Sequence, residues 1–217
     1  WPQGKRVAVS FSFDDARASQ ITAGLDLFAK HNARATFYVN PRNMDKQLDG
    51  WKRAVTLGHE IGNHSASHPC SANFPWSRRN ALEDYTLDRL EADFDSAHRD
   101  IRRLLSVNAK TFAYPCGSKY VGRGEHTQSY VPLIASRYLV GRGFRDESAN
   151  DPLHADFAQL LGVDSDGMSF EQMLARVKNA EGVWETTLGP IAPGAYRYNF
   201  NMDGVTVIDP RSPSVSE

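Results

Sequence analysis

The sequence predicts an α/β fold built as a distorted or incomplete (β/α) barrel. Over about the first 180 residues, short runs of β-branched and aromatic residues alternate with longer runs whose apolar residues recur at helical spacing. Strict alternation of strand and helix favours a parallel sheet, because each helix returns the chain to the same end of the sheet. The 217 residues, 41% of them hydrophobic, suffice for the core of one sizeable domain.

The first half of the alternation consists of four segments. Residues 7–13 are rich in β-formers and predict a strand, and residues 20–31 carry apolar side chains at helical spacing. A second strand is expected at 35–39 and a second helix at 48–57. That helix should end at Gly58, because glycine adopts the left-handed conformation after a helix at little cost.

The second half centres on the longest helical pattern, residues 82–105, in which an apolar stripe runs among charged residues. A short strand at 59–62 precedes it. The other elements expected from periodicity are strands at 111–114, 138–140 and 157–161 and a helix at 170–178.

The pattern changes near residue 182, which divides the chain into a (β/α) domain, 1–182, and a short C-terminal β extension, 183–217. Within the extension, Asp203-Gly204 predicts a hairpin turn. Its strand-like runs, with no helical pattern between them, are 183–188, 195–200 and 205–208.

Bulk charge argues against partners that bind by electrostatic attraction. With 25 basic and 26 acidic residues the net charge is −1, so no uniform field favours nucleic acid or an anionic membrane. No apolar run approaches the roughly 20 residues that cross a bilayer. We therefore expect no nucleic-acid or membrane partner and a neutral or weakly charged substrate, and any signal peptide lies outside this chain.

Two adjacent carboxylates, Asp14 and Asp15, follow the first predicted strand. A (β/α) barrel places its catalytic groups at the carboxyl ends of the strands. There, one carboxylate could bind a metal ion while the other stays free as a base. Taken alone, such a pair is more often a helix cap or a solvated turn.

His64 and His68 follow the third predicted strand, four positions apart, so both rings can lie on one face of a turn and reach one ion. Two histidines and one carboxylate, with open positions for water and substrate, form a recurrent catalytic zinc site. The alternative is a pair of loop histidines used for capping or packing, and the pair alone does not decide between them.

A third cluster lies where the strand at 111–114 runs into Pro115-Cys116-Gly117. A turn of this kind can aim a backbone N–H at an oxygen that becomes negative in a transition state. Taken alone, this segment is only the end of a strand. Because the other two clusters also follow strands, the three together indicate one active site.

The three clusters together resemble the first three motifs of the family 4 polysaccharide deacetylases, which are carbohydrate esterases with a NodB homology domain. The matching segments are Ser12-Phe13-Asp14-Asp15, His64-Ser65-x-x-His68 and Phe112-Ala113-Tyr114-Pro115-Cys116-Gly117. The resemblance covers about residues 5 to 182 and implies a metal-dependent hydrolase that removes acetyl groups from polysaccharide with metal-activated water.

Site roles follow from the resemblance by position. Asp14 would be the base, and Asp15, His64 and His68 would bind one divalent metal ion, expected to be zinc, with cobalt or nickel as alternatives. The Cys116 N–H would form part of the oxyanion hole. Tyr114, in the same motif, is also assigned a catalytic role.

Two positions depart from the family pattern. The third motif ordinarily carries an arginine that orients the base, whereas this chain has Ala113; Arg142 or Arg145 could substitute, although either could be a solvated loop charge, and we assign Arg145. The last motif, Leu-x-His, supplies the general acid, and no histidine follows His154. We therefore expect a domain truncated before its last motif and an activity weakened by the missing acid.

Further residues are expected around the same rim. Phe74, Trp76 and Pro115 are expected to contact the sugar, the first two by stacking. Cys70 follows His68 by two positions and should form a disulfide with Cys116. The resemblance and the expected disulfide together imply a secreted, extracellular protein.

The extension resembles the later strands of family 48-type carbohydrate-binding modules, which precede some feruloyl esterases. The matching segments are Val183-Trp184-Glu185-Thr186-Thr187-Leu188 and Pro193-Gly194-Ala195-Tyr196-Arg197-Tyr198-Asn199-Phe200. This likeness implies part of a multidomain plant cell-wall-degrading enzyme and favours acetylated xylan over chitin or peptidoglycan. The alternatives are a catalytically inactive module that binds metal and carbohydrate, and a purely structural spacer.

Overall fold

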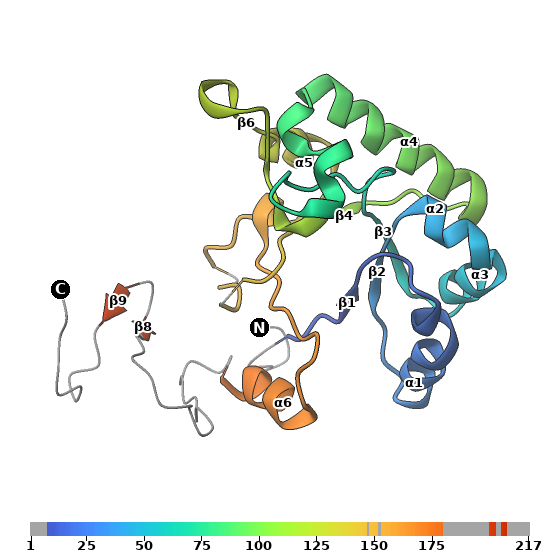
Figure 1. Ribbon diagram of the computed structural model, residues 1–217. Coiled ribbons are helices and arrows are strands. Elements are labelled where there is room, and N and C mark those ends of the chain that lie inside the picture. Colours follow the sequence, from blue (N-terminus) through green and yellow to red (C-terminus); the bar gives the residue numbers. More distant parts are fainter. Residues whose placement is uncertain (1–7, 147, 152, 180–199, 203–204, 208–217) are drawn as a thin grey trace.

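The structure is a computed structural model that describes residues 8–179, except 147 and 152, together with 200–202 and 205–207. Its main element is a five-stranded sheet in which every strand is parallel to its neighbours. In spatial order the strands are β1 (Ser12–Phe13), β2 (Thr36–Val39), β3 (Glu60–Asn63), β4 (Thr111–Ala113) and β7 (Val140–Arg142). The sheet curls into a half-barrel (Figure 1), which confirms the predicted fold class.

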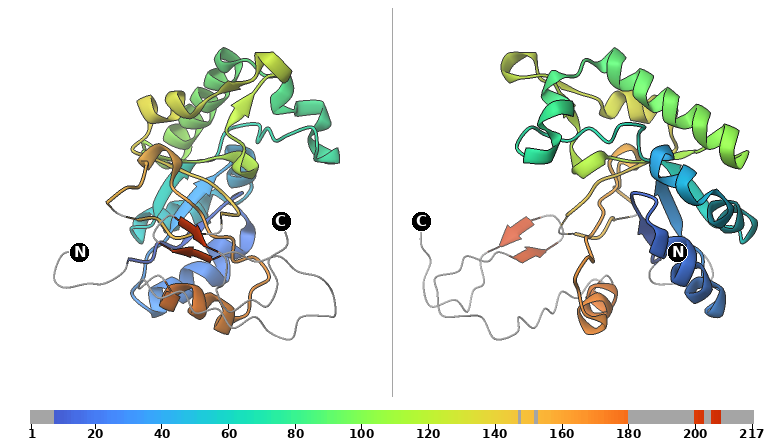
Figure 2. Two further views of the ribbon diagram at one scale, coloured as in Figure 1. Left: turned by 90° about the vertical axis from the view of Figure 1, so that its left-hand side faces the viewer. Right: turned by 45° about the vertical axis from the view of Figure 1, so that its right-hand side comes forward.

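Helices connect the strands and cover the sheet. They are α1 (Leu25–Lys30), α2 (Pro41–Met44), α3 (Leu48–Thr56), α4 (Leu87–Leu105), α5 (Val131–Arg137) and α6 (Phe170–Asn179). Shorter helical turns are Gln20–Gly24, Asp45–Gln47, Pro75–Asn80, Leu82–Asp84, Pro115–Gly117, Gly124–His126 and Phe157–Gln159. The views in Figure 1 and Figure 2 agree that α4 and α5 lie together, away from α1.

Two apolar clusters form the core and fix the sheet from its helical side. One surrounds Phe37 of β2 and Trp51 of α3, which are at most 1% exposed. The other joins Phe94 of α4 to Phe112 of β4 and Ile134 of α5, all fully buried. Burial of these rings and aliphatic chains stabilises the packing of the helices against the sheet.

The long helix α4 shows why the sequence pattern overestimated its length. The Thr86 side chain accepts the Arg89 N–H at 3.2 Å and so caps the helix, while Tyr85 before it is extended. The predicted segment 82–105 is therefore split into the turn Leu82–Asp84 and the helix proper. The helix ends at Ser106, which adopts a left-handed conformation with φ 59°.

Two further elements expected from the sequence can be compared with the structure. The strand expected at 157–161 is wrong: Asp156 accepts the Ala158 N–H at 2.9 Å and caps a helical turn, and only Leu160 bridges to Arg142. Gly58 ends the second helical segment as expected, with φ 79°. The run at 183–188 lies outside the described residues.

Two antiparallel hairpins accompany the sheet. One pairs β5 (Tyr120–Val121) with β6 (Gln128–Ser129), and the other pairs β8 (Phe200–Met202) with β9 (Val205–Val207). Of the strands expected at 195–200 and 205–208, the described residues include only Phe200, which begins β8, and Val205–Val207, which form β9. Residues 195–199 and the expected turn lie outside the described residues.

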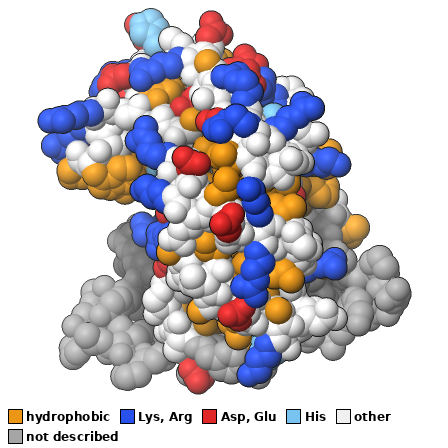
Figure 3. All heavy atoms as spheres, turned by 90° about the vertical axis from the view of Figure 1, so that its right-hand side faces the viewer, with side chains coloured by type: hydrophobic (Ala, Val, Ile, Leu, Met, Phe, Trp, Pro, Cys, Tyr) orange, Lys and Arg blue, Asp and Glu red, His pale blue; other side chains and the backbone are white. Residues whose placement is uncertain are grey.

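The surface carries charges of both signs. On the face in Figure 3, basic and acidic side chains are interspersed along the outside of the molecule, as the net charge of −1 implies. Among the described residues, no helix combines the length and the apolar character needed to cross a bilayer.

Candidate active site

The polar residues singled out from the sequence gather at the carboxyl ends of the parallel strands. Asp14 and Asp15 follow β1, His64 follows β3, and Arg142 is the last residue of β7. The carboxyl ends of parallel strands meet at one edge of a sheet, so residues far apart in the sequence become neighbours.

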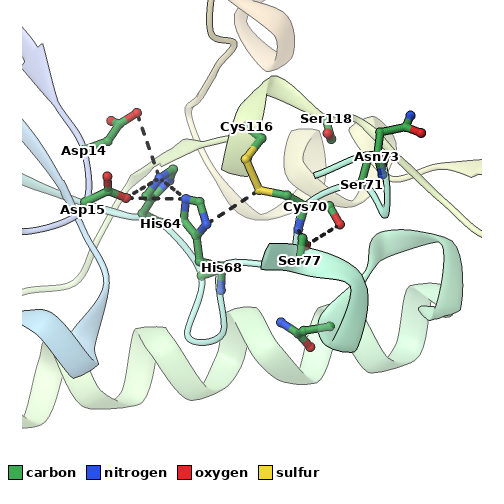
Figure 4. Close-up of a disulfide and its surroundings, with 12 residues drawn as sticks. Asp14, Asp15, His64, His68, Cys70, Ser71, Asn73, Ser77, Cys116 and Ser118 are labelled. Carbon is green, nitrogen blue, oxygen red and sulfur yellow. Dashed lines mark hydrogen bonds and ion pairs between the residues drawn. A yellow bond between two sulfur atoms is a disulfide. The ribbon is translucent and has the colours of Figure 1, made fainter. Parts of the chain in front are cut away.

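Asp15, His64 and His68 bring one ligand atom each to a common point (Figure 4). The two Nε2 atoms are 3.1 Å apart, and Asp15 Oδ1 is 3.7 Å from that of His64 and 3.5 Å from that of His68. Ligands about 2.0–2.2 Å from a tetrahedral zinc ion lie roughly 3.3 Å from one another. The donor set therefore fits one divalent ion, and these three side chains would hold it.

The orientation of His64 is fixed by a backbone carbonyl. Its Nδ1 lies 2.9 Å from the carbonyl oxygen of Ala113 on β4, and the side chain is buried. A carbonyl only accepts, so Nδ1 carries the proton and donates, and the lone pair of Nε2 faces the cluster. Metal-ligating histidines ordinarily use their second nitrogen in this way.

His68 is held in the neutral form that ligation requires. Burial and, next, the neighbouring His64 lower the pKa of His68, against the opposite effect of Asp15. A neutral imidazole can ligate at neutral pH without first losing a proton. Its Nδ1 faces Cys70, with Sγ 3.7 Å away.

The loop between the two histidines is anchored by a helix. The Asp93 carboxylate of α4 accepts the Ala66 N–H at 2.9 Å and the Ser67 N–H at 3.0 Å. Ser65, at φ 60°, accepts the His68 N–H through Oγ at 2.9 Å. The sequence pattern gives no signal for Asp93, because it is one of many charged residues beside the apolar stripe of α4.

The backbone of the Asp-Asp pair is also held from outside. The Gln20 amide donates to the Asp14 carbonyl at 2.6 Å, and the Asn43 amide donates to the Asp15 carbonyl at 3.0 Å. Asp15 itself has φ 72°, a left-handed conformation that costs free energy in a residue other than glycine. The two amides hold this turn and thereby aim the two carboxylates at different neighbours.

Arg142 pairs with Asp14, and this corrects the assignment of Arg145. The Arg142 guanidinium donates to Asp14 Oδ1 and to the Gly143 carbonyl, the latter at 2.7 Å, and lies 4.9 Å from the centre of the Tyr38 ring. Arg145 is 68% exposed and pairs with Asp164 at 3.3 Å. Arg142 is the last residue of β7 and its side chain faces the rim, whereas Arg145 lies in the following loop.

Asp14 lies beside the cluster without joining it. Its Oδ2 is 4.0 Å from His64 Nε2, while its Oδ1 is occupied by Arg142. One carboxylate, Asp15, thus belongs to the donor set, and the other is free for proton transfer.

The third motif contributes a strained turn and a disulfide. Cys116 has φ 54° and is bonded to Cys70, with the two Cα atoms 5.8 Å apart, the pair that the sequence analysis placed on one rim. The bond ties the turn after β4 to the loop after His68.

Two other residues of this motif do not reach the rim with their side chains. Tyr114, to which the sequence analysis assigned a catalytic role, is fully buried, and its hydroxyl donates to the Ala158 carbonyl at 2.7 Å, so its side chain does not reach the cluster of Asp15, His64 and His68. Pro115 is also buried, which leaves its ring unable to contact a sugar. Tyr114 lies two positions after Phe112, so alternation along the strand turns both of these rings toward the second core cluster.

Phe74 and Trp76 form an aromatic surface next to His68. Their rings are stacked with centres 5.4 Å apart, and the Trp76 ring centre is 6.3 Å from that of His68. Trp76 is 64% exposed. An exposed indole beside the site can stack on the apolar face of a sugar ring.

Two of the histidines downstream of His68 are exposed to solvent, and the third, His98, is half-buried on α4. His126 and His154 are 86% and 80% exposed, and their partners are Glu125 and Asp151. Since no histidine follows His154 in the sequence, the residues beyond the described part add none.

The chain is therefore a (β/α) protein with a parallel half-barrel and a two-histidine, one-carboxylate cluster at its strand ends. Comparison with known proteins is more specific: the family model for polysaccharide deacetylase matches residues 2–132. The chain belongs to the polysaccharide deacetylase family.

Individual relatives are similar over shorter stretches. The peptidoglycan-N-acetylglucosamine deacetylase PgdA of Listeria monocytogenes is 39% identical over 66 residues, 30% of this chain and 14% of that protein. A chitin deacetylase of Arthroderma benhamiae is 36% identical over 63 residues, 28% of this chain and 17% of that protein. The aligned segments thus span less than a fifth of either curated relative.

A solved structure supports the fold over a longer stretch. The Streptococcus pyogenes deacetylase PplD, in complex with acetate, superposes with a TM-score of 0.61 over 80% of this chain and 72% of that chain, at 18% identity. At 18% identity this likeness supports the half-barrel fold alone.

Proposed function

We propose that this chain hydrolyses acetyl groups on a polysaccharide with the help of one divalent metal ion, which we expect to be zinc. The observation that carries the proposal is the pairing of Arg142 with Asp14 directly beside the cluster of Asp15, His64 and His68. A metal ion bound there would lower the pKa of a water molecule and polarise the acetyl carbonyl.

The chain's own residues supply the remaining parts of the reaction. Asp14 takes the proton of the attacking water, and Arg142 pairs with this carboxylate and fixes its orientation. The backbone N–H of Cys116, on the turn tied to Cys70, donates to the oxygen that becomes negative. Trp76 offers a stacking surface for a sugar next to the reacting group.

The substrate we propose is an O-acetyl ester, with acetylated xylan as the first candidate. An alkoxide leaving group can be protonated by water, whereas the amine of an N-acetyl sugar must be protonated before it departs. Protonation by a positioned acid is typically worth about 10²- to 10⁴-fold. Among the described residues, His126 and His154 are exposed and pair with Glu125 and Asp151, so neither is placed as that acid, which favours the ester. The preference for xylan rests on the likeness of the C-terminal extension to a plant-wall esterase module.

Acetate release tests the proposal. We expect slow, metal-dependent release from acetylated xylan and from small aryl acetates, none from chitin oligomers or peptidoglycan, and no release by Asp14→Asn with metal bound. Efficient release from chitin oligomers would show that an acid is present and would overturn the preference for esters.

A second candidate function is a catalytically inactive module that binds metal and carbohydrate. The exposed Trp76 ring, stacked on Phe74 beside the cluster, favours it. Complete inactivity on esters, together with metal-dependent retention on a xylan column, would select this function. For either function we propose a secreted protein, because a disulfide such as Cys70–Cys116 persists in an oxidising compartment.

A further inference from the structure

The imidazole of His68 lies between two groups of potential metal ligands. Its Nε2 belongs to the cluster with Asp15 and His64, and its Nδ1 faces the disulfide (Figure 4). His68, Cys70 and Cys116 place one nitrogen and two sulfur atoms within 4.8 Å of one another. One ring is thus shared by two sets of three side chains.

The two histidines of the cluster differ in what holds their second nitrogen. His64 Nδ1 donates to a carbonyl, which is a strong acceptor. His68 Nδ1 has the Cys70 sulfur as its neighbour at 3.7 Å, and a disulfide sulfur is a weak acceptor and a poor ligand. Reduction would replace this neighbour by a thiol whose thiolate is among the preferred ligands of zinc and cobalt.

We propose that reduction of the Cys70–Cys116 disulfide creates a second metal site, formed by the two cysteine sulfurs and Nδ1 of His68. A dithiol reductant supplies two electrons and two protons: the S–S bond breaks, two thiols form, and the reductant becomes a cyclic disulfide. Binding of the ion then releases the thiol protons to solvent. Because the site uses the His68 ring, it competes with the cluster that contains Asp15 and His64.

The backbone on both sides of the disulfide is held by bonds that reduction leaves intact. The Cys70 N–H donates to Ser77 Oγ at 3.1 Å, and the Ser77 hydroxyl donates back to the Cys70 carbonyl at 2.9 Å. On the other side, the Gly117 N–H donates to the Tyr114 carbonyl at 2.9 Å. Two sulfurs on one tetrahedral ion, each at about 2.3 Å, lie about 3.8 Å apart. Rotation of the two side chains can provide that separation while the backbone stays in place.

Access favours reduction from the Cys116 side. Cys70 is fully buried, whereas Cys116 is partly exposed on its turn, so a small dithiol can attack the Cys116 sulfur first. The disulfide then has a role beyond tethering two loops: it keeps two thiolates from drawing His68 and its metal ion away from the hydrolytic cluster. Only this competition rests on the proposed function; the thiolate site itself does not.

Cobalt titration under anaerobic conditions tests the site independently of activity. We expect reduced protein, freed of excess dithiol, to bind one Co²⁺ with a thiolate-to-cobalt charge-transfer absorption that the oxidised protein lacks. The absorption should be lost in Cys70→Ser and Cys116→Ser and retained in His64→Ala, which removes a ligand of the first cluster only.

Reduced thiols in an unfolded chain could also bind cobalt, so two further measurements isolate the folded site. Binding by folded reduced protein should be about 10- to 100-fold tighter than in denaturant, and His68→Ala should remove most of that difference. Equal affinity in denaturant, no absorption after reduction, or full retention in Cys70→Ser would each overturn the proposal. Failure of the hydrolase assay with oxidised protein would bear on the proposed function and leave these results unaffected.

Discussion

The guanidinium of Arg142, at the end of β7, contacts the carboxylate of Asp14, just after β1, although 128 residues separate them. The two strands are at opposite edges of the five-stranded sheet, so the contact spans the mouth of the half-barrel. Arg142 also lies over Tyr38 and bonds the Gly143 carbonyl, which leaves the guanidinium little freedom to turn away. The contact thus brings a guanidinium to Asp14 from β7, whereas the third motif has Ala113 and offers none.

We predict that Arg142→Ala lowers kcat on an aryl acetate by about 10²-fold, because Asp14 loses the partner that orients it as a base. Arg142→Lys should recover only part of the loss, since an ammonium cannot both pair with Asp14 and stack on Tyr38. Steady-state kinetics with bound metal measured in each variant would check this. The matched control is Arg145→Ala, whose guanidinium is exposed and which should retain full activity. Equal losses in the two alanine variants would contradict the assignment.

Metal binding gives the second prediction. Zinc at about 100 times its Kd should raise the stability of the wild-type protein by about 2.7 kcal/mol, because it binds the folded state. His64→Ala removes one of three ligands, so its Tm should rise little or not at all with the same zinc concentration. Thermal unfolding with and without zinc measures the difference. His126→Ala, a change at an exposed histidine, should respond as the wild type does. A wild-type Tm that zinc leaves unchanged would count against the cluster as a metal site.

Asp93 supports the third prediction. Its carboxylate accepts two N–H groups of the loop between the metal-site histidines, so Asp93→Ala should loosen that loop without touching the metal. Loss of such outer support typically lowers metal affinity by about 10- to 100-fold. Competition with a chromogenic chelator measures the zinc Kd. Asp95→Ala, on the same helix but paired with Arg137 on the surface, is the control. Unaltered zinc affinity in Asp93→Ala would show that the loop is held by other contacts.

The alternation of elements and the position of the chemistry at strand ends could be predicted, because both depend on local spacing. The parallel order and the convergence of Asp15, His64 and His68 follow from where each strand ends. Arg142 and Arg145 could not be separated in this way, because both follow the strand expected at 138–140. In the structure the strand extends to Arg142, which pairs with Ala113 of β4, whereas Arg145 lies in the loop beyond.

Other features depend on tertiary contacts that leave no periodic signal. Asp93 has the same sequence context as its solvated neighbours on α4, and only the packing of that helix brings it to the histidine loop. Tyr114 belongs to the recognised motif, yet its side chain lies in the core because alternation along the strand directs it inward. The motif thus locates the turn, but it does not determine which side chains of the turn face the candidate active site.

The aromatic surface gives a prediction about substrate length. Trp76 is 64% exposed and stacked on Phe74, so Trp76→Ala should weaken binding of an acetylated oligosaccharide but not of an aryl acetate. A stacking contact of about 0.5–1.5 kcal/mol corresponds to a rise in KM of roughly threefold to tenfold, with kcat little changed. Trp76→Phe keeps a ring in place and should restore most of the affinity. A similar rise in KM for the aryl acetate would indicate damage to the metal site instead.

His59 supplies a prediction about pH and stability, away from the metal site. Its ring is buried, it packs 5.3 Å from the Phe37 ring centre, and its Nδ1 accepts the Ala35 N–H at 3.1 Å, which requires the neutral form. Burial, and to a smaller extent Arg34, lower the pKa of His59 below its ordinary 6.5. Above about pH 6.5 the ring is neutral in both the folded and the unfolded state. Below that pH the unfolded chain binds a proton at His59 that the folded chain does not bind, so the stability falls as the pH falls toward the lowered pKa.

In metal-free protein, the urea midpoint should therefore drop more between about pH 7.5 and 5.5 for the wild type than for His59→Asn, whose amide oxygen accepts the same N–H without titrating. His31→Asn, at an exposed histidine, should keep the wild-type dependence. Parallel curves for the wild type and His59→Asn would show that His59 contributes nothing to the acid sensitivity of the fold.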